Sequence, residues 1–193
     1  MTAFAGKVVW MTGVGTAIGK AGALMFAQEG AAVALIGRRR DKLDEVAAEI
    51  KAIGGKAAVE ALDVADRDKV GKAGERLLKR LGRVDILVIN AGLNVVNRRL
   101  NNITAEDWDY ILAVNLTEAF NMVQAAMPTM RNQKDGLIIN IVSTAAKRVS
   151  GVSLRFKTRK QKAQYFLRRP FQKDLRDRQC RLFWTSVHLV MRG

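Results

Sequence analysis

Five short apolar segments recur along the chain, and none shows the polar–apolar alternation of a half-exposed strand. They are rich in Val, Ile and Leu and span residues 8–11, 32–36, 57–62, 84–89 and 137–142. Continuous apolar runs of this length are typical of strands that are buried on both faces. The pattern therefore predicts a parallel sheet whose two faces are both covered.

Apolar residues at helical spacing fill the intervals between these segments. One stripe ends at Gly54-Gly55 and comprises Leu43, Val46, Ala47, Ile50 and Ile53. A second ends at Gly82 and comprises Val70, Ala73, Leu77, Leu78 and Leu81. Glycines directly after such stripes are typical helix ends.

Two further helices are expected before the fifth apolar segment. Thr104 is the expected N-cap of the first, with Glu106 and Asp107 in its first turn. The second is longer, and Pro128 is expected to kink it near its end. Strands that alternate with helices in this way predict an α/β fold with a doubly wound, Rossmann-like parallel sheet.

The first strand runs into a glycine-containing turn and then into an alanine- and glycine-rich helix. The turn reads Thr12-Gly13-Val14-Gly15-Thr16-Ala17-Ile18-Gly19. Free backbone N–H groups and the positive end of a helix dipole favour an anion at such a turn, most often a diphosphate. We therefore expect a nucleotide to bind here.

Polar residues follow the other strands at the edge where ligands of doubly wound sheets bind. Asp63-Val64 follows the third strand, Asn90-Ala91-Gly92 the fourth and Ser143 the fifth, while Asn115 lies between two helical stripes. Together with the glycine turn, this set resembles the short-chain dehydrogenase/reductase family over residues 6 to about 152. Members share a Thr-Gly-x-x-x-Gly-x-Gly turn, an Asn-Asn-Ala-Gly segment, a helix Asn and a Ser after the fifth strand.

The resemblance implies an NAD(P)-dependent oxidoreductase that transfers hydride between the cofactor and an alcohol or carbonyl substrate. It assigns adenine contacts to Asp63 and Val64 and a place along the cofactor to Asn90, Ala91 and Gly92. It gives catalytic roles to Ser143, which orients the substrate oxygen, and to Asn115, which holds a water of a proton relay. Family members assemble as dimers or tetramers, so a homo-oligomer is possible.

Each of these residues also has a purely structural interpretation. Asp63 could cap the following helix, Asn90-Ala91-Gly92 could form an ordinary turn, and Asn115 could satisfy a backbone group at a helix junction. Their joint occurrence at successive strand ends favours the functional interpretation. Two departures from the family, Ala17 for the middle glycine and Ile89 for the first Asn, remove no charged or catalytic group.

The second strand ends at Gly37, and three arginines follow it. An NAD site usually places an acid at this point for the ribose 2′-hydroxyl, whereas arginines suit a 2′-phosphate. The first acid is Asp41, which is expected to be the N-cap of the next helix. Arg38 and Arg39 therefore favour NADP over NAD, the alternative being a solvated basic turn.

The Tyr-x-x-x-Lys motif of the family is absent. Phe156 and Lys160 have the required spacing, but Phe has no hydroxyl, and Tyr165 is followed four residues later by Arg169. The alternative function is therefore a member that binds the cofactor but is catalytically impaired.

The composition changes at the same point. Residues 153–193 hold 12 of the 33 Lys and Arg residues and two of the 18 acids, within a net charge of +15. We therefore divide the chain into a dinucleotide-binding domain (1–152) and a basic, atypical tail (153–193), in which 182–191 could form one strand. A reading-frame shift near Ser153 would explain the change. Nucleic-acid binding by the tail is the less favoured explanation of its charge.

The composition excludes several other classes of protein. One cysteine and one histidine exclude an internal disulfide and a cysteine- or histidine-rich metal centre, so no metal is expected. No apolar run approaches the ~20 residues that span a bilayer, and the N-terminus lacks a signal-type segment. A cytoplasmic location without a membrane partner is expected.

Overall fold

A six-stranded parallel sheet forms the centre of the computed structural model, which describes residues 2–96, 101–143 and 181–189. The strands are β1 (Val8–Thr12), β2 (Ala32–Gly37), β3 (Lys56–Ala61), β4 (Ile86–Ile89), β5 (Asp135–Ser143) and β6 (Arg181–Leu189). Their order is β3-β2-β1-β4-β5-β6, and all neighbours are parallel. The order reverses direction between β1 and β4, which confirms the predicted doubly wound fold.

The five predicted strands agree with the observed ones to within two residues at each end. The sixth strand, expected within 182–191, is observed as β6 and pairs with β5 along its whole length. β6 thus joins the sheet of the first 143 residues, although it belongs to the predicted tail. The division of the chain at residue 152 stays a prediction.

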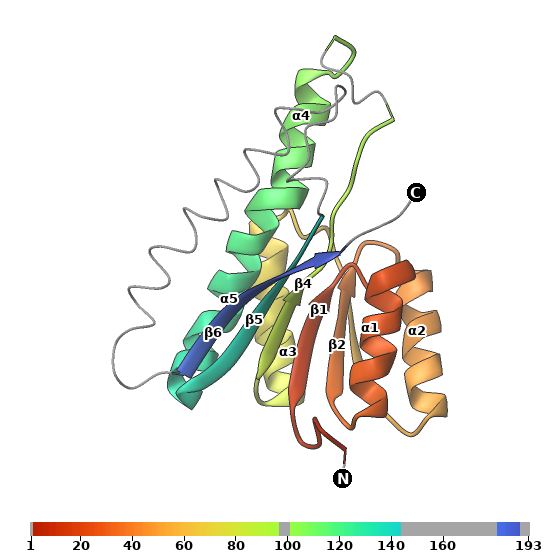
Figure 1. The fold of residues 1–193 in the computed structure, drawn as a ribbon, viewed down its shortest axis with the longest axis vertical. Helices are drawn as coiled ribbons and strands as arrows, with labels where there is room; N and C mark the ends of the chain where they lie inside the picture. The colour runs from red at the N-terminus through yellow and green to blue at the C-terminus, as the bar shows by residue number, and fades with distance from the viewer. Residues whose placement is uncertain (1, 97–100, 144–180, 190–193) are drawn as a thin grey trace.

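Two helical layers cover the sheet (Figure 1). On one face, α1 (Ala17–Gln28) and α2 (Arg40–Ala52) pack Ala23, Leu43, Val46 and Ile50 against β1, β2 and β4. On the other face, α3 (Arg67–Leu81) and α5 (Glu118–Gln133) form a second apolar cluster with Trp10, Ile36, Leu87 and Ile89. Burial on both faces explains why β1, β2 and β4 lack polar alternation. The same expectation is wrong for β3 and β5, in which buried positions alternate with partly exposed ones.

The helix ends follow their sequence signals in part. Gly82 ends α3 in the left-handed conformation, at φ +77°. Thr104 caps α4 (Ala105–Leu112), where its hydroxyl accepts a hydrogen bond from the Asp107 amide, as predicted. The expectation for Asp41 is wrong: Arg39 has the extended N-cap backbone, and Asp41 lies inside the first turn of α2. Ile53 lies beyond the end of α2 and is exposed.

α4 and α5 form one continuous run through a π-helical turn, η1 (Ala113–Thr117). A π turn adds a residue to the helical repeat and shifts the phase of the side chains that follow. This shift accounts for the two separate apolar stripes of the sequence. Asn115 lies in the turn, and Pro128 lies inside α5.

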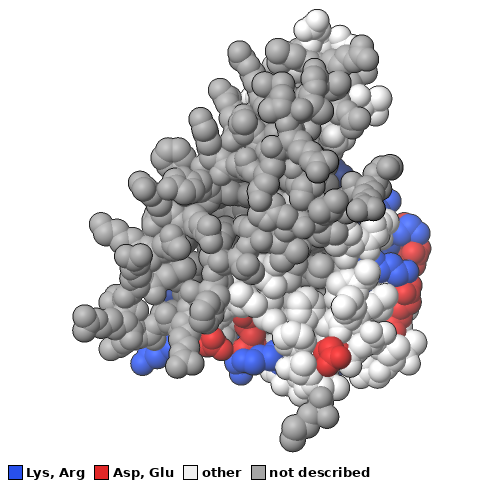
Figure 2. Space-filling model, in the orientation of Figure 1, with Lys and Arg blue, Asp and Glu red and all other residues white. Residues whose placement is uncertain are grey.

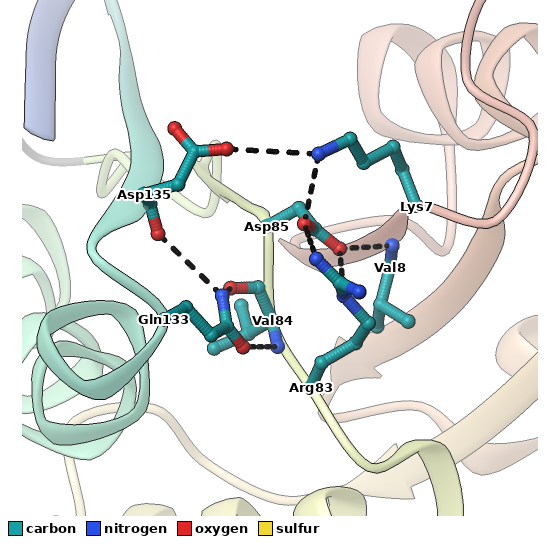
Figure 3. A network of polar contacts seen from close by, with 7 residues as sticks. All are labelled: Lys7, Val8, Arg83, Val84, Asp85, Gln133 and Asp135. Atoms are coloured by element: carbon teal, nitrogen blue, oxygen red, sulfur yellow. Dashed lines mark hydrogen bonds and ion pairs between the residues drawn. The ribbon is translucent and has the colours of Figure 1, made fainter. Parts of the chain in front are cut away.

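The side chain of Asp85 joins the amino ends of β1, β4 and β5, at the edge of the sheet opposite the strands' carboxyl ends (Figure 3). Asp85 accepts hydrogen bonds from the Val8 amide, from Lys7 and from two nitrogens of Arg83. Its own backbone pairs with Val8 of β1 and Leu137 of β5. The network therefore fixes β1 and β5 to the start of β4.

Some of the charged side chains on the described surface form ion pairs. On the face shown in Figure 2, acidic and basic side chains lie next to one another at the edge formed by α1 and α2. Three ion pairs belong to these helices: Lys20–Glu49, Arg40–Asp44 and Lys42–Glu45. No helix in the described residues is long and apolar enough to cross a bilayer.

Candidate functional site

A cavity of about 350 Å³ opens at the carboxyl ends of β1 to β4, where the strand order reverses. The structure brings thirteen of the fourteen residues predicted to bind the cofactor to its walls. These residues are Gly13, Gly15, Thr16, Ala17, Ile18, Gly19, Arg38, Arg39, Asp63, Val64, Asn90, Ala91 and Gly92. Residues distant in the sequence thus meet at one concave site.

The glycine turn is packed too closely for side chains at two positions. A Cβ on Gly19 would lie 2.1 Å from the carbonyl oxygen of Gly13. Gly13 has φ +68°, and its Cβ would lie 2.7 Å from Cα of Ala91. The turn therefore keeps bare backbone at the cavity wall beside the N-terminus of α1, which is the arrangement that an anion favours.

Ala17 is the first residue of α1 and has a left-handed backbone, with φ +48°. It is one of two non-glycine residues with positive φ in the described part of the chain. A Cβ in this conformation meets the backbone, which is why glycine is preferred there. The alanine for glycine exchange therefore strains the turn in addition to placing a methyl at the cavity wall.

Thr12 is the fourteenth residue, and it acts from beneath the cavity instead of lining it. It is completely buried, and its hydroxyl accepts hydrogen bonds from the amides of Asn90 and Ala91 at 3.0 and 2.9 Å. The Asn90 side-chain amide returns two bonds, to the carbonyls of Thr12 and Gly13, both at 3.1 Å. The two side chains therefore hold the end of β4 against the end of β1 and fix the position of the glycine turn.

Asp63 and Arg38 meet at the opposite wall through a residue that the sequence did not reveal. The Tyr110 hydroxyl donates to Asp63 Oδ2 at 2.9 Å and accepts from Arg38 Nη1 at 2.5 Å. The other oxygen, Asp63 Oδ1, accepts from the Ala65 amide. Asp63 does not cap the following helix, because Asp66 does so through the Lys69 amide.

The environment of Tyr110 keeps its phenol protonated. Burial is the main cause that raises the pKa of Tyr110, and the hydrogen bond and negative charge of Asp63 add to it. Arg38 acts in the opposite direction, but the pKa stays above its ordinary value. The hydroxyl can therefore donate to Asp63 throughout the neutral pH range.

Asn115 uses both polar atoms of its side chain to hold one residue of the loop after β4. Its Oδ1 accepts from the Leu93 amide at 3.2 Å, and its Nδ2 donates to the Leu93 carbonyl at 2.9 Å. A Cβ on Gly92 would lie 3.0 Å from the same Oδ1. The side chain therefore satisfies backbone groups, as one alternative held, while a second lone pair on Oδ1 and a second N–H on Nδ2 are not used by these two bonds. Its role in holding a water stays a prediction.

Ser143 is the last residue of β5, on the same edge of the sheet as the cavity. The positions of Phe156, Lys160, Tyr165 and Arg169 lie outside the described residues. No group of three or more His, Cys, Asp or Glu side chains is placed to hold a metal ion within the described ranges.

Five further residues line the cavity without having been predicted: Gly37, Leu43, Leu62, Leu93 and Val114. Gly37 and Leu62 adjoin predicted residues at strand ends, so position alone could have identified them. Leu43 and Val114 reach the cavity from helices and carry no local signal beyond apolarity.

A family comparison agrees with this geometry. The model of the short chain dehydrogenase family matches residues 7–180, which is most of the chain. The chain belongs to this family.

Two curated relatives illustrate the similarity. The chain is 39% identical over 138 residues to the 3-oxoacyl-acyl-carrier-protein reductase of Thermotoga maritima, covering 72% of this chain and 56% of the reductase. It is 40% identical over 149 residues to the mouse peroxisomal multifunctional enzyme type 2, covering 70% of this chain and 19% of the enzyme. The chain thus spans about half the length of the reductase and about a fifth of the mouse enzyme.

Solved structures share the fold over nearly the whole chain. A metagenomic short-chain oxidoreductase in complex with NADP superposes with a TM-score of 0.85 at 32% identity, covering 95% of this chain and 82% of that one. An NAD⁺-bound xylitol dehydrogenase superposes with a TM-score of 0.86 at 28% identity, covering 99% and 73%.

Proposed function

We propose that the cavity binds a nicotinamide dinucleotide with its diphosphate against the glycine turn. The observation that carries this proposal is the bare backbone at Gly13 and Gly19, where any Cβ would collide with neighbouring backbone. Because these two positions carry no side chain, the backbone of the turn lies bare at the cavity wall beside a helix N-terminus, where a diphosphate is the best-matched ligand group. Asp63 and Val64 would then hold the adenine, and Asn90 to Gly92 would lie along the cofactor.

We propose NADP as the preferred dinucleotide. Arg38 and Arg39 both line the cavity at the end of β2, where a carboxylate would select the unphosphorylated ribose. The similar solved structures include complexes with NADP and with NAD⁺, so the residues of this chain must decide between them. Two guanidinium groups at this point support the phosphorylated form.

The reaction that fits this site is hydride transfer between NADP(H) and an alcohol or carbonyl substrate. The nicotinamide supplies the hydride chemistry when it is bound. Ser143, at the cavity edge of the sheet, would orient the substrate oxygen by a hydrogen bond. Asn115 would keep Leu93 in place and, as the family resemblance implies, hold a water of the proton relay.

A second candidate is a cofactor-binding protein without turnover. The sequence contains two tyrosines, and neither is followed four residues later by a lysine. Tyr110 is engaged between Arg38 and Asp63 and lies behind the wall formed by the ends of β2 and β3. Loss of a positioned general acid typically lowers a rate by ~10²–10⁴-fold, so this candidate predicts binding with little or no reduction of carbonyl compounds.

Calorimetry with NADP⁺ and NAD⁺ tests the binding proposal, and an NADPH-oxidation assay over a panel of aldehydes and ketones separates the two candidates. Arg38→Gln should weaken NADP⁺ binding selectively. The matched control is Arg40→Gln, because Arg40 follows in the same basic run but pairs with Asp44 and does not line the cavity. Absence of heat with either dinucleotide, on folded protein, would refute both candidates.

A further inference from the structure

One side chain outside the cavity walls touches two of the three charged residues at the adenosine end of the proposed site. Tyr110 projects from α4, while Arg38 follows β2 and Asp63 follows β3. Its hydroxyl accepts from Arg38 and donates to Asp63, and the Arg38 guanidinium also lies 5.9 Å from the centre of the tyrosine ring. A single phenol oxygen therefore separates a cation from an anion.

This separation matters because no ion pair with another described residue holds either group in place. Neither Arg38 nor Asp63 forms a salt bridge with any residue that the structure describes. Opposite charges so close together would normally move into direct contact, since a bidentate Arg–carboxylate pair is the strongest arrangement open to them. The hydroxyl satisfies one acceptor site of Asp63 and one donor of Arg38, and it occupies the space between them.

We propose that Tyr110 is a positioning residue for cofactor selectivity, whose hydroxyl keeps Arg38 from pairing with Asp63 and leaves the guanidinium available to a 2′-phosphate. This inference rests on the proposed dinucleotide site. The neutral hydroxyl uses one of the five N–H donors of Arg38, and the full positive charge remains for the ligand. The raised pKa of Tyr110 keeps the donor to Asp63 in place at neutral pH.

Removal of the hydroxyl gives a directional result. In Tyr110→Phe the ring remains, but the charged groups lose the polar atom between them. Arg38 and Asp63 then pair directly, which partly neutralises Arg38 and turns it away from the phosphate. The ratio of the NAD⁺ and NADP⁺ dissociation constants should fall roughly three- to tenfold, the range that corresponds to one lost hydrogen bond.

Calorimetric titrations of NADP⁺ and NAD⁺ into four proteins test this inference: the wild type, Tyr110→Phe, Arg38→Gln and the double variant of both. Adenine contacts are common to the two dinucleotides, so they cancel in the ratio. Tyr110→Phe should weaken NADP⁺ binding and leave NAD⁺ binding within about twofold. In the Arg38→Gln background the same substitution should leave the ratio unchanged, because Tyr110 acts through Arg38.

A rescue variant distinguishes this role from a merely structural one. Asp63→Asn added to Tyr110→Phe removes the carboxylate that competes for Arg38, and the ratio should return toward that of the wild type. A ratio that Tyr110→Phe leaves unchanged, or a loss that persists without Arg38, overturns the inference while the dinucleotide site stands. A wild type that binds neither dinucleotide refutes the proposed function itself. Melting temperatures confirm that each variant is folded, and Asp63→Asn in the wild-type background provides a second test, with an unchanged or higher ratio expected.

Discussion

Replacement of Asp85 by Asn tests whether the hydrogen-bond network at the amino ends of the strands stabilises the fold. The Asp85 side chain is 3% exposed and accepts from Arg83 at 2.6 and 2.8 Å, from the Val8 amide at 2.9 Å and from Lys7 at 3.2 Å. Burial alone would raise the pKa of Asp85, but the hydrogen bonds from Arg83, Val8 and Lys7 outweigh it and lower the pKa. The folded protein therefore favours the ionised carboxylate.

The magnitude follows from the exposure of the partners. A hydrogen bond to a charged group contributes about 1.5–3 kcal/mol. The side chains of Arg83 and Lys7 are 46% and 41% exposed, so water compensates part of the loss. The asparagine also turns an NH₂ group toward donors that need an acceptor. We expect a loss of about 2–3 kcal/mol at pH 7, or roughly 5–10 °C in Tm for a chain of this size.

Urea unfolding followed by tryptophan fluorescence measures this loss, because Trp10 lies in the core. The matched control is Asp135→Asn, since Asp135 is exposed and meets Lys7 only at 3.6 Å; its effect should stay below about 1 kcal/mol. Because the pKa of Asp85 is lower in the folded than in the unfolded protein, its carboxylate stabilises the fold fully above the unfolded-state pKa of about 3.9. This stabilisation is lost as the pH falls through the folded-state pKa of Asp85. The difference between wild type and Asp85→Asn should therefore shrink below about pH 4. A difference that stays constant from pH 7 to pH 3 would refute the assignment to the carboxylate charge.

Two predictions concern the glycine turn. Ala17→Gly should stabilise the protein by about 1 kcal/mol in urea unfolding, because it relieves a left-handed alanine at φ +48°; a destabilised variant would contradict the strain. Gly19→Ala should abolish detectable NADP⁺ binding in calorimetry and lower Tm, because its Cβ would lie 2.1 Å from the Gly13 carbonyl. Gly71→Ala is its control: open space surrounds that position inside α3, so the substitution should raise stability by roughly 0.5–1 kcal/mol and leave binding intact.

The fold could be predicted from the sequence because its signals are local and repeated. The strands β1, β2 and β4 are nearly continuous apolar runs, and the helices α1, α2, α3 and α5 each present a stripe to one face of the sheet. Helix caps were less secure. An acid near a helix start indicates the first turn, but only the backbone decides which residue is the N-cap. Asp41 therefore lies two residues beyond the N-cap, which is the extended residue Arg39.

The cavity walls formed by the backbone could also be predicted, since they come from residues directly after strands. The interactions between side chains could not. The contact of Arg38 with Tyr110 spans 72 residues, and that of Tyr110 with Asp63 spans 47. No pattern within a single element indicates which helix residue faces two strand ends. The π turn at Asn115 is visible in the sequence only as a shift between two apolar stripes. Such a shift indicates a change of helical phase but does not give the geometry of the turn.

Two groups of hydrogen-bonded side chains position the site, one below the cavity and one at its wall. We expect substitutions in the two groups to have different effects. Thr12 and Asn90 lie beneath the cavity and join β1 to β4, so their hydrogen bonds belong to the same packing that holds the sheet together. Arg38, Tyr110 and Asp63 lie at the wall, where they order one another but carry little of the core. Changes in the lower group must alter stability and binding together, because the glycine turn depends on it. We expect changes at the wall to alter the choice between dinucleotides while the fold stays intact.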